Sequence, residues 1–345
     1  MKYTNIEKSF NQNRSVLGEV LPLSTPYTVL IDISDMCNLR CNYCFRYDES
    51  ISAVDYRKNK LMDWETFVKV VKQLKEFPEQ IKRISLSHNG EPLCNRLLPK
   101  MVRYIKESGL TGTTEIHTNA LLLTPEYIKE LCDANIDRIV VSIQGLDSER
   151  YEEVCGAKIK FSYLVDMLTL LFETKTNTQV HIKIVDVAVG EQKDKFYQIF
   201  APIGDRVFVE TVVPLWTGID EKNCEQVNNK FGDDFGLQQC CPLIFYTMDI
   251  LPDGTIYPCS HIAPPFKLGN VHTDTLKEAW ESTQKKEFLM KMLKFGRFLT
   301  PECEKCYIPQ NTVVSKEDSI DAYRDDILRR MVENEILEEM ECLKE

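Results

Sequence analysis

The sequence predicts an α/β fold in which a partial (βα)6 barrel, of the TIM-barrel kind, is followed by a small second domain and a C-terminal helix. From Thr28 to about Val213, short runs rich in Val and Ile alternate with longer stretches whose apolar residues recur every three or four positions. This alternation is typical of βα units around a parallel sheet. After Asp220 the composition changes to a stretch rich in Asn, Gln, Asp and Gly, and residues 316–345 are acidic with helical apolar spacing.

Six barrel strands are expected, each rich in β-branched residues. They are Thr28–Ile33, Arg83–His88, Thr113–Thr118, Arg138–Ile143, Val180–Val185 and Arg206–Val213. Helices are expected between them at Trp64–Lys75, Leu97–Ser108, Pro125–Ala134 and Phe161–Thr174. Because functional groups in such barrels lie on the loops that follow the strands, residues directly after each strand are the first candidates for a site.

A hairpin is expected beyond the barrel. The runs Phe245–Ile250 and Thr255–Tyr257 flank the turn sequence Pro252-Asp253-Gly254. We therefore expect a barrel domain over residues 1–225, a second domain over 226–312 and an acidic helix over 313–345.

Composition excludes several classes of protein. The chain of 345 residues has a net charge of −11 and no tract rich in Lys or Arg, so nucleic acid is not an expected partner. No apolar run approaches the roughly 20 residues of a membrane span, and the N-terminus lacks the pattern of a secretory signal. A cytoplasmic protein without a membrane partner is expected.

Cysteine spacing gives the strongest functional signal. The chain has 13 cysteines, and clustered cysteines in a reducing compartment more often bind metal than form disulfides. Cys37, Cys41 and Cys44 form a C-x3-C-x2-C loop directly after the first strand. Three thiolates can hold three irons of a 4Fe-4S cluster and leave the fourth iron open, whereas a structural zinc site has four ligands.

This loop resembles that of the radical S-adenosylmethionine superfamily, in which an aromatic residue precedes the last cysteine, as Tyr43 does here. The resemblance implies that the open iron binds the methionyl part of S-adenosylmethionine and that Tyr43 lies against the adenine. An electron from a donor such as flavodoxin or ferredoxin then cleaves the cofactor. The resulting 5'-deoxyadenosyl radical abstracts hydrogen from an unactivated carbon.

Two further segments resemble superfamily motifs. Residues 88–92 resemble the Gly-Gly-Glu-Pro segment, with Asn89 in place of the first glycine and with Gly90, Glu91 and Pro92 retained. Thr118 and Asn119 resemble a Thr-Asn-Gly segment. An ordinary Asn-Gly turn is the alternative for the first segment.

The resemblance also directs Ser142 and Lys183 toward the ribose and carboxylate of the cofactor. Each is equally well explained as a structural polar residue.

A second cysteine set resembles the start of the SPASM/twitch extension of these enzymes. Its members are Cys241, Cys259, Cys303 and Cys306, with Cys240 as an alternative to Cys241. Four thiolates can close a second, auxiliary 4Fe-4S cluster. A four-cysteine zinc ribbon is the alternative, because its spacing is similar.

Three other residues are candidates for the chemistry. The Cys155 thiol could return a hydrogen atom to a substrate radical, the Glu210 carboxylate could accept a hydroxyl proton, and the Trp216 indole could stack on a sugar. For each residue a structural role is the alternative.

The leading functional hypothesis is oxidation of an alcohol carbon on a sugar, cyclitol or nucleotide-linked saccharide, as in the one-cluster aminocyclitol dehydrogenases that the motifs resemble. Only 36 residues precede Cys37, which is short for the peptide-recognition domain of many peptide-modifying relatives. Epimerisation or crosslinking of a ribosomal peptide, and a zinc-binding structural module, remain the alternatives.

Overall fold

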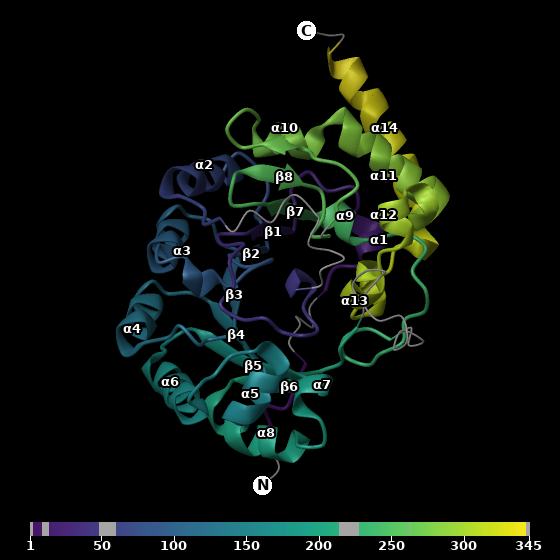
Figure 1. Cartoon of the computed structure of the whole chain (residues 1–345). Helices are drawn as coiled ribbons and strands as arrows, with labels where there is room; N and C mark the ends of the chain where they lie inside the picture. Colours follow the sequence, from purple (N-terminus) through teal and green to yellow (C-terminus); the bar gives the residue numbers. More distant parts are fainter. Residues whose placement is uncertain (1–2, 9–13, 48–59, 214–227, 262, 343–345) are drawn as a thin grey trace.

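The computed structural model describes residues 3–8, 14–47, 60–213, 228–261 and 263–342. One curved sheet lies at the centre of the molecule (Figure 1), and its strands follow the order β6-β5-β4-β3-β2-β1-β7-β8-β9. The strands are β1 Thr28–Ile31, β2 Arg83–Ser85, β3 Thr113–Thr118, β4 Arg138–Ile143, β5 Gln179–Val185, β6 Arg206–Glu210, β7 Thr247–Ile250, β8 Thr255–Tyr257 and β9 Gly269–Asn270. Strands β1 to β6 pair in parallel, so the expected open (βα)6 barrel is confirmed.

Helices cover the outer side of the barrel strands (Figure 1). They are α2 Trp64–Leu74, α3 Leu98–Glu107, α4 Pro125–Asp133, α5 Ser148–Cys155, α6 Phe161–Thr174, α7 Asp186–Val189 and α8 Lys193–Phe200. Local sequence explains where several begin: the Asp63 carboxylate caps α2, and Thr124 caps α4 with Pro125 at its first position. Their apolar faces bury Phe67, Met101 and Leu131 against the sheet.

The hairpin beyond the barrel does not stand apart from it. Strand β7 pairs in parallel with β1, with Ile31 opposite Ile250, and β8 then pairs antiparallel with β7. The expected boundary between residues 225 and 226 lies outside the described residues, as does Trp216. The division into domains therefore stays a prediction.

The remaining helices pack beside this extension of the sheet. They are α1 Leu17–Val20, α9 Leu243–Tyr246, α10 Leu276–Glu281, α11 Thr283–Phe295, α12 Pro301–Glu304, α13 Ile308–Thr312 and α14 Arg324–Cys342. Helix α14 is the C-terminal helix, but it begins at Arg324 and not at the expected residue 313, because residues 313–323 form irregular segments and two short 3-10 helices. It shares a second apolar core with α1 and α11 that includes Leu17, Met292 and Ile327. No helix among the described residues combines the length and apolar character that a membrane crossing needs.

The two faces of the barrel strands differ in polarity. On β2 and the residues that follow it, Ile84 and Leu86 are fully buried in the apolar core, whereas Ser85 and Ser87 belong to a polar network. Because side chains alternate along a strand, polar residues of β2 to β6 share the inner face of the barrel. The interior is therefore polar, and the loop that follows β1 carries the cysteine motif.

Candidate functional site

The three-cysteine loop begins where β1 ends, and two other loops hold its backbone. The Glu91 N–H donates to the Met36 carbonyl at 2.7 Å, while Arg40 and Asn42 N–H groups donate to the carbonyls of Cys155 and Val154 at 3.0 and 2.8 Å. Helix α5 thus anchors the loop on both sides of Cys41.

The three thiols of this loop influence one another's ionisation. The thiol of Cys37 has its pKa raised to about 11 by burial, with further contributions from Glu91 and Cys44 nearby. Cys41 interacts with both other cysteines. Three half-buried thiols on one short loop fit the ligand set of a cluster with one open iron.

Gly90 is required by the packing of two loops. A Cβ atom built at this position would lie 2.2 Å from the Ser34 carbonyl oxygen and 2.5 Å from that of Met36. Only glycine lets the loop after β2 lie against the residues that precede Cys37. The packing of these two loops therefore explains why position 90 is a glycine.

Glu91 holds the ends of β2 and β3 together. Its carboxylate is 3% exposed and accepts hydrogen bonds from Leu93 N–H at 3.1 Å, Asn119 N–H at 2.7 Å and the Thr118 hydroxyl at 2.5 Å. Burial raises the pKa of Glu91 to about 7 although these donors favour the charged form. Pro92 begins the short 3-10 helix Pro92–Cys94, which Glu91 caps.

The predicted motif residues are joined by contacts that spacing did not reveal. The Asn119 amide donates to Asn38 at 2.8 Å, which connects the end of β3 to the cysteine loop. The Tyr43 hydroxyl donates to Gln144, and the Gln144 N–H donates to the Tyr151 hydroxyl at 3.1 Å. The carbonyl of Asn89 accepts from Arg46 at 3.2 Å. Asn38, Arg46, Gln144 and Tyr151 were missed because they belong to no motif.

Cys155 lies against the cysteine loop and not toward the barrel interior. Its side chain is 1% exposed, its thiol donates to the Tyr151 carbonyl at 2.9 Å, and it is hydrogen-bonded to Cys41. The contacts of this thiol are with the cysteine loop and with helix α5, and they do not support the expected hydrogen-donor role, which stays a prediction.

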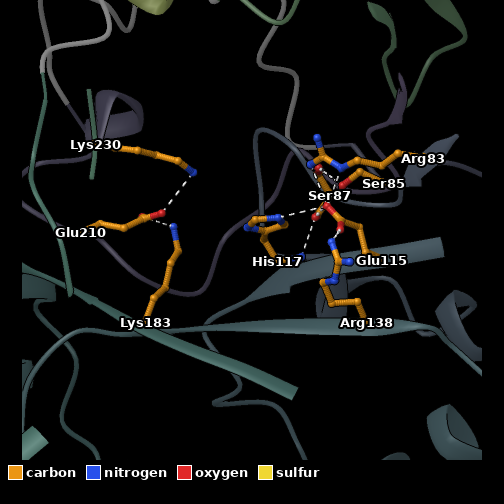
Figure 2. A network of polar contacts seen from close by, with 9 residues as sticks. All are labelled: Arg83, Ser85, Ser87, Glu115, His117, Arg138, Lys183, Glu210 and Lys230. Carbon is orange, nitrogen blue, oxygen red and sulfur yellow. Dashed lines mark hydrogen bonds and ion pairs between the residues drawn. The ribbon is translucent and has the colours of Figure 1, made fainter. Parts of the chain in front are cut away.

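Two ion networks occupy the barrel interior (Figure 2). In the first, the buried Glu115 carboxylate accepts from Arg83 at 2.7 Å, Arg138 at 3.0 Å and His117 at 3.3 Å. The Ser87 hydroxyl accepts a hydrogen bond from the backbone N–H of His117 at 2.7 Å. Burial would raise the pKa of Glu115, but the cationic partners outweigh it and lower that pKa.

The second network places the predicted residues Lys183 and Glu210 in direct contact. Lys183 donates to Glu210 at 2.5 Å, and Lys230, from beyond the barrel strands, lies 3.1 Å from the other carboxylate oxygen. Burial alone would raise the pKa of Glu210, but the two lysines outweigh it and lower the pKa to about 2. Such a carboxylate is a weak proton acceptor, which argues against the expected role of Glu210 as a base.

Ser142, the other residue that the resemblance directs toward the cofactor, is half-buried at the end of β4.

The second cysteine set surrounds one cavity. Cys241, Cys259, Cys303 and Cys306 all line it, together with His261, Glu302 and apolar side chains. Cys240 is fully buried on the other side of the chain, where its thiol faces the Met292 carbonyl at 3.7 Å. Cys241, and not Cys240, is therefore placed to complete a four-cysteine site.

Thiolates bind zinc and also iron-sulfur clusters. A cavity lined by four cysteine side chains can therefore hold an iron-sulfur cube, with zinc as the alternative.

Comparisons with known proteins agree with these two sites. Residues 31–195 match the model of the radical SAM superfamily, and residues 240–307 match that of SPASM, an iron-sulfur cluster-binding domain. The chain is 28% identical over 169 residues to the tungsten-containing aldehyde ferredoxin oxidoreductase cofactor-modifying protein of Pyrococcus furiosus, covering 49% of this chain and 45% of that protein. It is also 28% identical over 173 residues to the GTP 3',8-cyclase of Staphylococcus haemolyticus, covering 48% and 49%. The chain thus spans about half the length of these curated relatives.

Solved structures share the fold. The native structure of anSMEcpe with bound AdoMet has a TM-score of 0.58 and 17% identity, covering 92% of this chain and 100% of that chain. BtrN in complex with AdoMet and 2-DOIA has a TM-score of 0.53 and 20% identity, covering 86% and 97%. From the two matched domains and the two cysteine sites, the chain is a radical SAM superfamily enzyme with a C-terminal SPASM domain, and its cofactors are S-adenosylmethionine and 4Fe-4S clusters.

Proposed function

We propose that this radical SAM enzyme oxidises an alcohol carbon of a small substrate, of the sugar, cyclitol or nucleotide-linked saccharide class, to a carbonyl group. The observation that carries the proposal is the four-cysteine site: a cluster with four thiolate ligands has no iron open to substrate, so electron transfer is the chemistry left to it. An electron acceptor beside a radical site is what a net two-electron oxidation needs.

The chain's own residues have defined parts in this proposal. Cys37, Cys41 and Cys44 hold the first cluster, and Cys241, Cys259, Cys303 and Cys306 hold the auxiliary cluster. S-adenosylmethionine, when bound and reduced, supplies the 5'-deoxyadenosyl radical. Tyr43, Asn89–Pro92, Thr118, Asn119, Ser142 and Lys183 are the proposed surroundings of that cofactor.

The polar barrel interior supports a hydroxylated substrate. Arg83, His117 and Lys230 have side chains 41%, 37% and 36% exposed although they face the interior, so they are accessible to a ligand there. BtrN, which shares the fold, was solved with the small molecule 2-DOIA. Streptococcus suis SuiB, bound to the precursor peptide SuiA, has a similar TM-score of 0.54, so a peptide is the competing substrate class.

Anaerobic reconstitution followed by a substrate screen tests the proposal. We expect about eight irons per chain and release of 5'-deoxyadenosine when reductant and S-adenosylmethionine are added. Cys44→Ala serves as the inactive control. Candidate sugars, cyclitols, nucleotide-linked saccharides and peptides are then compared by mass spectrometry. A loss of two hydrogens from an alcohol supports the proposal, and turnover of peptides alone contradicts it.

A further inference from the structure

A buried polar cluster lies where β1, β7 and the loop after β2 meet, and it takes part in neither ion network of the barrel. It consists of Asp32, directly after β1, Asp249, on β7, and His88, in the loop after β2. His88 precedes Asn89 of the proposed cofactor segment, and its ring contacts Ser260, the neighbour of Cys259. The cluster therefore connects the loop beside the first cysteine site with the segment that carries the second.

The two carboxylates are held in place by the joined sheet. Because β1 and β7 are parallel neighbours, with Leu30 opposite Asp249, the side chains of Asp32 and Asp249 project on the same face. The Asp32 N–H donates to the Ile250 carbonyl at 2.8 Å, and one Asp32 oxygen accepts from the Asn89 N–H at 3.3 Å. The exposed fractions of Asp32 and Asp249 are 0% and 2%.

Each carboxylate keeps one oxygen without a hydrogen-bond partner among the described residues. These atoms are Oδ1 of Asp32 and Oδ1 of Asp249. A buried carboxylate without a full set of partners favours its protonated form. Burial raises the pKa of Asp32 to about 7 and that of Asp249 to about 8, so the pair exchanges protons near neutral pH.

The ring of His88 is fixed in one tautomer. Its Nε2 lies 2.9 Å from the Ser260 carbonyl oxygen and 3.8 Å from the Asp249 carboxylate. A carbonyl oxygen only accepts, so Nε2 carries the hydrogen and Nδ1 carries the lone pair. Burial lowers the pKa of His88, which keeps the ring neutral near pH 7.

The second ring nitrogen of His88, Nδ1, makes no hydrogen bond to the part of the chain that the structure describes. The side chain as a whole is 23% exposed. A neutral imidazole with one nitrogen fixed by a carbonyl and a carboxylate, and the other open, has the arrangement of a general base.

We propose that His88 accepts, at Nδ1, the proton of the substrate hydroxyl during alcohol oxidation, with Ser260 and Asp249 orienting its ring and Asp32 stabilising the imidazolium. This inference rests on the proposed function. It gives the proton-accepting role to His88 in place of Glu210, which is paired with two lysines.

The step balances as follows. The substrate carbon loses a hydrogen atom to the 5'-deoxyadenosyl radical, which leaves a carbon radical that still carries its O–H group. The hydroxyl proton passes to Nδ1 of His88, and the O–H bonding pair stays on oxygen. One electron leaves to an oxidised iron-sulfur cluster, and the C=O double bond forms.

The test compares two products in the same reaction. For the alcohol that the wild-type enzyme oxidises, the ratio of carbonyl product to 5'-deoxyadenosine is measured for His88→Gln, whose side-chain amide can still donate to the Ser260 carbonyl. We expect the ratio to fall by about a hundredfold while 5'-deoxyadenosine is still formed. The matched control is His272→Gln, since the His272 ring hydrogen-bonds to Thr66 and Lys69 of helix α2, and it should keep the wild-type ratio.

A pH profile separates a base from a structural residue. The wild-type ratio should rise as His88 loses its proton, and the His88→Gln ratio should not depend on pH in that range. In Asp32→Asn, the midpoint of the pH profile should lie at lower pH than in wild type, because the negative charge that favours the imidazolium of His88 is removed. The other charged groups that act on the cluster are Asp35 and Arg83, and both stay unchanged in these variants.

The outcomes are distinguishable. Equal iron content and absorption of wild type and His88→Gln establish that both are folded and loaded. An unchanged ratio of carbonyl product to 5'-deoxyadenosine in His88→Gln overturns the base role alone. The base role is also overturned if the carbonyl product and 5'-deoxyadenosine are lost together. A wild-type enzyme that cleaves S-adenosylmethionine but oxidises no alcohol overturns the proposed function, and the base role with it.

Discussion

Neighbouring cysteines in the second site differ in what they line. Cys240 is fully buried in the apolar core of α1, α11 and α14, whereas Cys241 packs only partly against that core and lines the four-cysteine cavity. The N–H of Cys240 donates to Asp321 at 2.7 Å, which fixes the backbone at this point. A sequence with two adjacent cysteines cannot show which one faces the cavity, because consecutive side chains of a turn point in different directions.

We expect Cys241→Ser to lose about four of the eight irons that two clusters require and Cys240→Ser to keep them. The physical reason is that only the Cys241 sulfur faces the other three ligands. Iron content and visible absorption after anaerobic reconstitution check this. Iron loss in Cys240→Ser with full loading in Cys241→Ser would reverse the assignment.

Glu210 shows how a long-range partner changes a residue's role. Sequence placed it at the end of a barrel strand, where a base is plausible. Lys183 on β5 lowers the pKa of Glu210 most, and Lys230, which lies 20 positions after Glu210 in the chain and contacts it at 3.1 Å, lowers it further. No spacing rule connects the two residues.

We expect Glu210→Gln to lower the free energy of unfolding by about 3 kcal/mol at pH 7, as the lowering of its pKa from 4.5 to about 2 implies for a buried carboxylate. Because the folded pKa is depressed to about 2, this stabilisation is present above the unfolded pKa and is lost as pH falls toward 2. Denaturant titrations at pH 7 and pH 3 measure the difference. The control is Glu153→Gln, whose carboxylate is exposed and pairs with Arg150; a constant difference at both pH values would contradict the assignment.

Among the structural elements, the loop after β2 is fitted to the loop after β1. Glycine at position 90 and the Glu91 N–H bond to Met36 hold the two loops in contact. The sequence identified both segments by resemblance. Their mutual packing explains why the glycine is needed, and that required the structure.

We expect Gly90→Ala to displace the three-cysteine loop and to reduce both iron binding by that loop and release of 5'-deoxyadenosine at least tenfold, about 1.4 kcal/mol. The added Cβ would overlap two backbone carbonyl oxygens, those of Ser34 and Met36. Gly109→Ala is the control: its Cβ meets nothing within 4 Å, although its φ of +83° costs about 1 kcal/mol of stability. Normal cofactor cleavage by Gly90→Ala would show that the loops are not in contact.

For the molecule as a whole, the continuous sheet joins the barrel to the SPASM region. Strand β7 adds to the edge of the barrel at β1, and helices α10 and α11 follow on the same side (Figure 1). The apolar core of the barrel includes Met248, Ile250 and Trp280 from this region. The two parts therefore share a core and are expected to unfold together.

We expect Ile250→Ala to lower stability by about 2 to 4 kcal/mol and to reduce amide protection in β1 as well as in β7. Ile250 is fully buried, and its carbonyl accepts from Asp32 after β1. Calorimetry and hydrogen exchange measure the two effects, with Val187→Ala, 49% exposed, as the control. Two separate unfolding transitions, with β1 protection unchanged, would contradict a shared core.

The sequence by itself determined the barrel strands, the helices between them and the cysteine spacing. The expected strands Thr113–Thr118 and Arg138–Ile143 agree with β3 and β4 at both ends, because alternation and β-branched residues act within a few positions of the chain. Only the tertiary structure decided that β7 lies beside β1, that Cys241 faces the cavity, that Lys230 pairs with Glu210, and that His88 lies between Asp249 and Ser260. These contacts join residues far apart in the chain, and they depend on how the elements pack, which local patterns do not encode.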